Sequence, residues 1–258
     1  MSTIEIPTSL FEDGWLTSTE HIVSSGKEGT VYCCGASSRI DADFVAVKVY
    51  RPRDTRSFKN DSMYVQGRAL NVSLNGPGGI PKAAGAPDQR LARAIKKRSK
   101  AGKRASEGSW THHEFATLTA LHRIGARVPE PFTSTGNAIV MEYLGAPDAP
   151  APKLKDVNLS PADARTVFRD LMDEIALWLS WERIHGDLSP FNILWWNQAI
   201  TVIDVPQAIN PYDNPLAFSL LERDIANVCA HFRTLPAARD PGQIARTMWQ
   251  QIVQQPAF

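Results

Sequence analysis

The chain has 258 residues, of which 43% are hydrophobic and 21% are charged, and its formal net charge is +1. This composition is ordinary for a soluble globular protein that can bury a real core, as one large domain or as two lobes, and the net charge by itself selects no partner. The sequence has no apolar run of membrane-spanning length, no signal peptide at its start and three cysteines without a C-x-x-C pair, so we expect a cytoplasmic protein with no membrane partner.

Residues 22–49 are rich in β-branched and apolar side chains, and they predict strands around a glycine-bearing turn. The turn has the pattern S-x-G-x-x-G-x-V. Glycines let a backbone approach phosphate groups, so this pattern is typical of a lid over a nucleotide. A plain hairpin would look the same, and the turn alone leaves both interpretations open. The candidate nucleotide-binding residues here are Ser24, Gly26, Lys27, Gly29 and Val31.

Lys48 lies within an apolar, β-rich run at residues 44–50. A lysine in such a strand is either an edge residue or a functional group with a charged partner, and edge lysines are common. In a nucleotide site, Lys48 would supply a compact positive charge for the phosphate oxygens.

Residues 51–109 contain a Gly- and Pro-rich tract that predicts a loop or a disordered segment. Residues 90–104 contain eight basic side chains and no acid. This cluster is either a solvated basic loop or an electrostatic footprint for RNA or another polyanion. Aromatic residues do not interleave it, which argues against a stacking platform for single strands. The basic residues are Arg90, Arg93, Lys96, Lys97, Arg98, Lys100, Lys103 and Arg104.

A helix is predicted over residues 111–124, because apolar residues recur there about one turn apart. Thr111 and Glu114 match a capping box at its start, which would give Glu114 a structural role. In the functional interpretation, Glu114 instead forms an ion pair with Lys48 and holds it against phosphate groups.

The apolar run at residues 137–145 predicts a strand that leads into a hinge, and a Pro-rich stretch follows. We place a lobe boundary here, with an N-terminal lobe over residues 1–145 and a C-terminal lobe over residues 146–258. The first lobe would contain a long, flexible, basic insertion over residues 52–109. An adenine would dock on the hinge, near Met141, Glu142 and Leu144.

The second half of the chain predicts three helices. Ser160 and Pro161 fit the N-cap and N1 positions of a long helix that ends before residue 185. Two further apolar patterns predict helices over residues 220–232 and 241–255, the latter capped by Asp240.

The sequence from His185 to Asn192 reads H-x-D-x-x-x-x-N, and a hydrophobic-Asp-hydrophobic step centred on Asp204 follows. Two β-rich runs between Asn192 and Asp204, joined by a turn, predict a hairpin that returns Asp204 to Asp187 and Asn192. Oxygen ligands of this kind suit Mg²⁺ held against phosphates, and a nearby Asp can orient an attacking hydroxyl. The alternative is that Asp187, Asp204 and Asn192 are hydrated polar residues in turns, without a catalytic role.

The residues within these motifs resemble those of the RIO family of atypical protein kinases. The motifs occur in the same order and together span most of the chain. The N-terminus is too short for the winged helix of one RIO branch, so the chain resembles the branch without it. The matching motifs are G-K-E-G-T-V-Y at residues 26–32, A-V-K-V-Y-R at 46–51, W-x-x-x-E at 110–114, H-G-D-L-S-x-F-N at 185–192, I-D-V-P-Q-A at 203–208 and R-D-I-A-N-V at 223–228.

The resemblance implies an α+β, two-lobed protein-kinase-like fold, with an antiparallel sheet plus a helix in the first lobe and a mainly helical second lobe. It implies ATP and Mg²⁺ as cofactors and a serine/threonine kinase activity with autophosphorylation. Asp187 would be the catalytic base or would orient the attacking hydroxyl, and Asn192 and Asp204 would hold the metal. Asp204 would also accept phosphate as an aspartyl intermediate, which would make the protein an ATPase. Asp224 would brace the catalytic loop by hydrogen bonds.

Three departures from the family pattern leave the protein substrate open: Pro190 in place of Glu, Gly29 in place of Ala, and Glu142 in place of Ser. An alternative enzyme is a small-molecule phosphotransferase of the aminoglycoside or choline kinase type, which shares the H-G-D and the downstream Asp. An alternative of another class is a module in which ATP switches binding to a ribonucleoprotein. RIO proteins of eukaryotes and archaea act in small ribosomal subunit maturation, so RNA or a ribosomal particle is a candidate partner for the basic segment.

Overall fold

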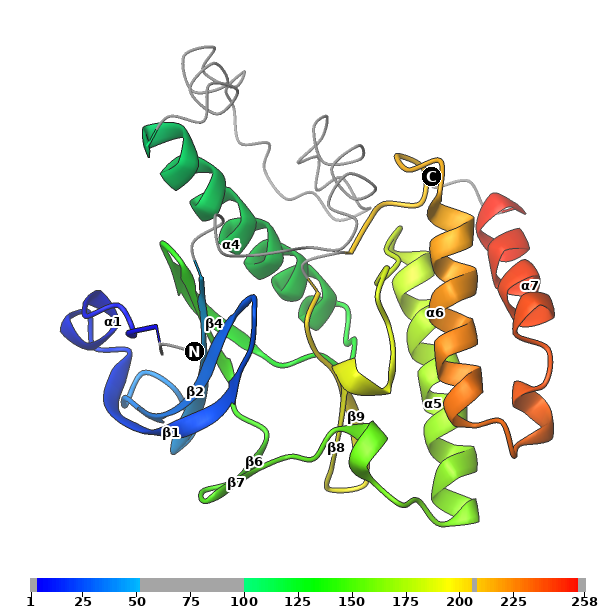
Figure 1. Cartoon of the computed structure of the whole chain (residues 1–258), viewed down its shortest axis with the longest axis horizontal. Helices are drawn as coiled ribbons and strands as arrows, with labels where there is room; N and C mark the ends of the chain where they lie inside the picture. The colour runs from blue at the N-terminus through cyan, green and yellow to red at the C-terminus, as the bar shows by residue number, and fades with distance from the viewer. Residues whose placement is uncertain (1–3, 52–99, 206–207, 255–258) are drawn as a thin grey trace. The chain divides into compact units, whose positions relative to one another are not determined.

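The computed structural model describes residues 4–51, 100–205 and 208–254 (Figure 1). The described residues fall into two compact units. The first contains residues 4–51, 100–122 and 129–150, and the second contains residues 123–128 and 151–254 without 206–207. The first 48 residues of the expected insertion, 52–99, lie outside the described residues, and with them most of the basic cluster.

The first unit is built on a five-stranded antiparallel sheet with the strand order β1-β2-β3-β5-β4. The central strand β3 is apolar at every position except Lys48, so it is stable only with neighbours on both sides. The strands are β1 (Leu16–Ser25), β2 (Gly29–Ala36), β3 (Phe44–Tyr50), β4 (Pro131–Thr135) and β5 (Ala138–Glu142).

The two faces of β3 serve different purposes, because successive side chains of a strand point to opposite faces. Val45, Val47 and Val49 are fully buried in a core that includes Leu10 and Leu16. Leu10 belongs to the short helix α1 (Ser9–Glu12), which covers this face. Lys48 therefore points to the other face of the sheet, where Figure 1 shows helix α4 (Lys100–Arg123).

The structure corrects two predictions about α4. The helix is already formed at Lys100, so residues 100–109 are helical and not part of a flexible insertion. Thr111 consequently lies inside the helix, and the capping-box interpretation of Glu114 is wrong. The physical reason is that Ala, Lys, Arg and Glu in the upstream residues have high helix propensity, and a helix already formed at its packed end is extended at little cost.

The second unit is mainly helical. Figure 1 shows its helices α5, α6 and α7 beside one another. They are α5 (Pro161–Ser180), α6 (Ala217–His231) and α7 (Pro241–Gln254). The Ser160 side chain accepts a hydrogen bond from the Asp163 backbone N–H, and Asp240 accepts one from Gln243, which confirms both expected N-caps. Helix α6 begins three residues earlier than its apolar pattern predicts.

A hairpin of β8 (Ile193–Trp196) and β9 (Ala199–Val202) follows the H-x-D motif, as expected. Asn197 and Gln198 form its turn with φ values of 48° and 60°. The short elements of the structure are β6 (Gly145–Ala146), β7 (Ala149–Pro150) and the 3-10 turns η2 (Leu154–Asp156), η3 (Pro190–Asn192) and η4 (Pro236–Ala238).

The expected α+β organisation is confirmed by these elements. Strand β4 is absent from the sequence predictions, which treat the Pro-containing residues before it as an extended link. Pro131 begins β4 at the edge of the sheet, where its missing N–H costs no ladder hydrogen bond. Across the described ranges, no helix is both long enough and apolar enough to cross a membrane.

Candidate functional site

The expected ion pair between Lys48 and Glu114 is present in the first unit. Lys48 Nζ lies 2.8 Å from Glu114 Oε1, and the two side chains are only 11% and 6% exposed. The Tyr50 hydroxyl donates a hydrogen bond to Glu114 Oε2, and the Lys48 ammonium lies 5.0 Å from the Tyr50 ring centroid. The Lys48 ammonium on strand β3 is thus buried and held in one place by Glu114 of helix α4 and by Tyr50.

The glycine-bearing turn between β1 and β2 is closed by a hydrogen bond from the Gly26 N–H to the Gly29 carbonyl oxygen at 2.9 Å. A Cβ at Gly29 would lie 2.4 Å from the Val49 carbonyl oxygen, whereas one at Gly26 would meet no atom within 4 Å. Gly29 is therefore required by close backbone packing, and Gly26 leaves open space above the turn. Ser24 and Lys27 are exposed, and Val31 is half-buried.

The candidate hinge residues lie at and just beyond the end of strand β5, which pairs with the central strand β3. Met141 and Glu142 pair with Ala46 and Val45 across β3 and β5. The Glu142 N–H donates to the Glu130 carbonyl oxygen at 2.8 Å, so the residue before β4 already occupies this donor. Leu144 lies just beyond β5 and is half-buried.

In the second unit, Asp224 braces the H-x-D loop, as the resemblance implies. Its two carboxylate oxygens accept the backbone N–H of Gly186 at 2.7 Å and that of Leu188 at 2.9 Å. These two residues flank Asp187, and Gly186 has a φ of 80°, which favours glycine. Burial raises the pKa of Asp224 to about 7, although the two N–H donors act to lower it.

Asp187 is held on this braced loop as an exposed residue whose carboxyl is only partly covered. This partial burial raises the pKa of Asp187; Arg223 opposes the shift and the carboxylate of Asp204 adds to it. The return of the chain toward this loop is seen in the hydrogen bonds of Asn192, which contacts both Asp187 and Ile203, the residue before Asp204.

Asn192 joins the same group. Its Nδ2 donates to the Asp187 carbonyl oxygen at 2.8 Å, and its own carbonyl oxygen accepts from the Ile203 N–H at 2.9 Å. Asp204 follows with a φ of 67°, a left-handed conformation that Asp tolerates better than most residues. A non-glycine residue held there stores backbone strain, a feature that is concentrated at functional sites.

The side chains of Asn192 and Asp204 carry oxygen donors, the donor type that suits a magnesium ion. The Asn192 contact uses its donor atom and leaves Oδ1, an atom type that Mg²⁺ prefers. Within the described residues, no group of three or more His, Cys, Asp and Glu side chains is gathered for a metal. Two protein ligands are still the expected number when phosphate oxygens and water complete the coordination.

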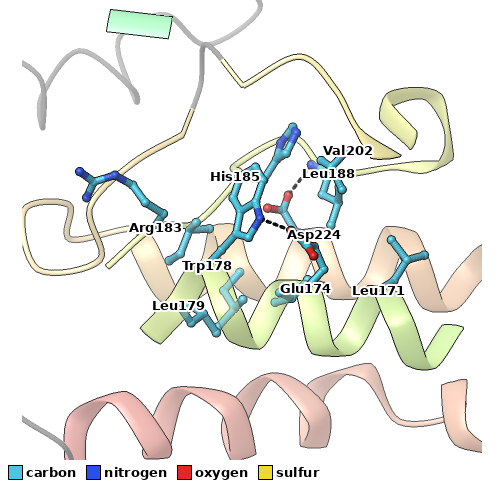
Figure 2. A pocket seen from close by; sticks show the side chains of 12 residues that line it. Leu171, Glu174, Trp178, Leu179, Arg183, His185, Leu188, Val202 and Asp224 are labelled. Atoms are coloured by element: carbon cyan, nitrogen blue, oxygen red, sulfur yellow. Dashed lines mark hydrogen bonds between the residues drawn. The ribbon is translucent and has the colours of Figure 1, made fainter. Parts of the chain in front are cut away.

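A buried network behind this loop is absent from the sequence predictions. Glu174 Oε1 accepts the Trp178 indole N–H and the Arg127 backbone N–H, each at 2.8 Å. The Trp178 ring stacks on His185 with 5.5 Å between centroids, and His185 Nε2 lies 3.3 Å from the Ile203 carbonyl oxygen. Figure 2 shows these side chains around a pocket under the H-x-D loop. The only sequence signal for this role of Glu174 is that it is an acidic residue within the apolar stripe of α5.

The predicted site residues are thus gathered in two groups, one in each unit. Lys48, Glu114 and the glycine turn make up the first, and Asp187, Asn192 and Asp204 make up the second. A firmly held ammonium, a glycine turn, a braced Asp and two further oxygen-bearing side chains are residue types that phosphoryl transfer uses.

Comparison with protein families finds a match to the RIO domain model over residues 86–241. The chain is 31% identical over 232 residues to the RIO-type serine/threonine-protein kinase Rio1 of Haloferax volcanii, a match that covers 90% of this chain and 69% of that protein. It is 30% identical over 227 residues to the serine/threonine-protein kinase RIO1 of Caenorhabditis elegans, covering 88% of this chain but only 39% of that protein. The match to human RIO1 covers 33% of the relative, so the chain spans less than half the length of these two eukaryotic proteins.

Among solved structures, the chain resembles the Rio2 kinase of Chaetomium thermophilum in its ADP/Mg²⁺–phosphoaspartate complex. The TM-score is 0.60 at 20% identity, and the match covers 92% of this chain and 64% of that chain. A second structure of the same kinase gives a TM-score of 0.59. These similarities confirm the kinase-like fold class.

Proposed function

Because the chain belongs to the RIO family of protein kinases, we propose that it is a serine/threonine protein kinase that uses ATP and Mg²⁺. The observation that carries this proposal is the braced H-x-D loop, on which Asn192 contacts both Asp187 and Ile203, the residue before Asp204. The names of the relatives support the same activity.

We assign the steps to this chain's own residues. Lys48, held by Glu114, binds phosphate oxygens of ATP, and the glycine turn covers them. Asp187 orients the attacking hydroxyl and accepts its proton, for which a raised pKa is an advantage. Asn192 and Asp204 would hold Mg²⁺, which when bound neutralises charge on the phosphate oxygens. The adenine would lie against the hinge at Met141, Glu142 and Leu144.

A second reaction at the same site is ATP hydrolysis through Asp204. In this reaction, an Asp204 oxygen attacks the γ-phosphorus, ADP departs, and water then cleaves the aspartyl phosphate to release inorganic phosphate. The related Rio2 kinase has been solved as a phosphoaspartate complex, which supports this assignment by analogy. The protein would then work as an ATPase, with autophosphorylation as a side reaction.

The basic residues 90–104 make RNA or a ribosomal particle a proposed partner, on charge alone. A filter-binding titration with structured RNA should show an affinity that falls as salt rises. Neutralising Lys96, Lys97 and Arg98 should weaken this binding, and an unchanged affinity would exclude the proposed contact.

The activity is tested by incubating the pure protein with Mg²⁺ and γ-labelled ATP, beside an Asp187→Asn control. Acid-stable label on serine indicates a protein kinase, and label removed by hydroxylamine indicates phosphate on Asp204. A panel of amino alcohols and sugars is tested in parallel. Robust transfer to one of these without any protein label would replace the proposal with a small-molecule phosphotransferase.

A further inference from the structure

Arg51 makes three contacts with the glycine turn, directly after the end of β3. Its backbone N–H donates to the Glu28 carbonyl oxygen at 2.9 Å. Its guanidinium Nε donates to the Gly26 carbonyl oxygen at 2.9 Å, and a terminal guanidinium nitrogen lies 3.3 Å from Ser25 Oγ. One side chain thus binds the first half of the turn, while its backbone binds the second half.

These contacts come from the side of the sheet opposite Lys48. Lys48 points toward Glu114 on α4, whereas Ser25, which the Arg51 guanidinium contacts, pairs with Thr30 and so lies on the face of Val49, opposite Lys48. The same face carries Tyr32, whose pKa Arg51 lowers against the larger raising effect of burial. Arg51 therefore acts on the backbone of the turn and not in the place of Lys48.

A turn with two glycines loses much conformational freedom when it is ordered. If binding of a nucleotide must order it, the affinity for the nucleotide falls by that cost. A charged donor on the Gly26 carbonyl oxygen orders the turn beforehand, and a hydrogen bond with one ionised partner is stronger than a neutral one.

We propose that Arg51 is a positioning residue, which holds the glycine turn closed from outside the nucleotide site and thereby strengthens binding of the phosphate part of ATP. This inference rests on the proposed function, because it requires that the turn covers a nucleotide. It adds a residue that binds neither ATP nor metal.

The test uses the whole chain with Arg51→Met, which removes the donor and keeps the aliphatic stem. Arg39→Met is the matched control, because Arg39 is an exposed arginine of the same unit whose guanidinium lies over Trp15, 5.4 Å from the ring centroid. Arg51→Lys keeps a charged donor but lacks the planar guanidinium that contacts Gly26 and Ser25 together. For each variant, we would measure the affinity for ATP, ADP and adenosine by calorimetry, and the KM and kcat for ATP.

Loss of the contacts should raise the ATP KM and the Kd of ATP and ADP about tenfold, the usual effect of one hydrogen bond to a charged group. The Kd of adenosine and the kcat should stay within about twofold, because the turn covers phosphates and not the base. Arg51→Lys should recover part of the affinity, and Arg39→Met should match the unchanged chain.

Amide hydrogen exchange at residues 25–29 in the nucleotide-free protein gives a readout independent of activity, and Arg51→Met should accelerate it. Two results would overturn the proposal: an unchanged ATP affinity in Arg51→Met, or an equal loss for adenosine and ATP, which would indicate general damage to the sheet. Failure of the unchanged chain to bind ATP would instead reject the proposed function, and with it the premise of the inference.

Discussion

Glu174 accepts two hydrogen bonds on one carboxylate oxygen, from the indole of Trp178 and from the backbone of Arg127, both at 2.8 Å. The Arg127 carbonyl oxygen in turn accepts the Val202 N–H at 2.7 Å, two residues before Asp204. The segment that follows α4 is therefore fastened to both α5 and the hairpin that leads to the proposed metal ligand.

Replacing Glu174 with Leu should lower the free energy of unfolding by about 3 kcal/mol, because two buried N–H donors lose their acceptor. Glu174→Gln keeps an acceptor oxygen and should cost less than about 1.5 kcal/mol. Urea denaturation of the three proteins measures both effects. Equal losses in the two variants would show that the side chain acts by packing and not as an acceptor.

The pKa of Glu174 determines how its contribution to the free energy of unfolding changes with pH. Burial raises it, although the Trp178 and Arg127 donors act in the opposite direction. The folded state therefore binds the Glu174 proton more tightly than the unfolded state. Its stabilising contribution is complete below the unfolded pKa and is lost as pH rises through the folded pKa. Glu174→Gln should flatten this part of the stability–pH curve, and an unchanged slope would contradict the shift.

Removing one partner of the Lys48–Glu114 pair should be costly, because the remaining charge is almost fully buried. We expect Lys48→Met and Glu114→Leu each to destabilise the protein by about 3 kcal/mol. The double variant should lose less than the sum of the two, since it leaves no unpaired charge. Thermal or urea unfolding measures the coupling, and strictly additive losses would mean that the pair contributes no interaction energy.

Asp187→Asn and Asp204→Ala should separate turnover from binding. The first should leave ATP binding nearly intact and remove turnover, because only the proton acceptor is lost. The second should also weaken binding of ATP in the presence of Mg²⁺. Calorimetry with and without Mg²⁺, beside phosphate release, distinguishes the two effects. Equal affinities of the two variants for ATP in the presence of Mg²⁺ would contradict the assigned roles.

Asp224→Asn should loosen the H-x-D loop, because an amide has a single oxygen to accept the Gly186 and Leu188 N–H groups. We expect a loss of about 2 kcal/mol, measured near neutral pH. With a pKa of about 7 in the folded state and an ordinary value of 3.8, Asp224 contributes stability at low pH that declines as pH rises through this window. The unfolding free energy of the variant should therefore change less between about pH 4 and about pH 7 than that of the unchanged chain.

Gly29→Ala should distort the glycine turn, whereas Gly26→Ala should not, because only the first places a Cβ 2.4 Å from a backbone oxygen. We expect Gly29→Ala to lower stability by about 1–3 kcal/mol, and Gly26→Ala to leave it within about 0.5 kcal/mol. A melting experiment on both variants is sufficient. Similar melting temperatures for the two would show that the turn relaxes without cost.

The residues that we propose to carry the chemistry could be selected from the sequence alone. Lys48 and Asp204 could be named because each is a charged residue within an apolar, β-rich run, and Asp187 and Asn192 because their spacing with His185 matches one known arrangement. The α5 boundaries and the β8–β9 hairpin were also predictable, since caps, turns and side-chain periodicity are local signals.

The tertiary structure decided what depends on contacts between distant segments. It showed that α4 is already helical at Lys100, that Glu114 pairs with Lys48 and caps nothing, and that Asp204 has a left-handed backbone. The roles of Glu174 and Arg51 arise in the same way, because each acts on backbone atoms far away in the chain, and a backbone amide or carbonyl leaves no mark in the sequence. Side-chain pattern predicts which face is buried, whereas only the folded chain determines which buried groups meet.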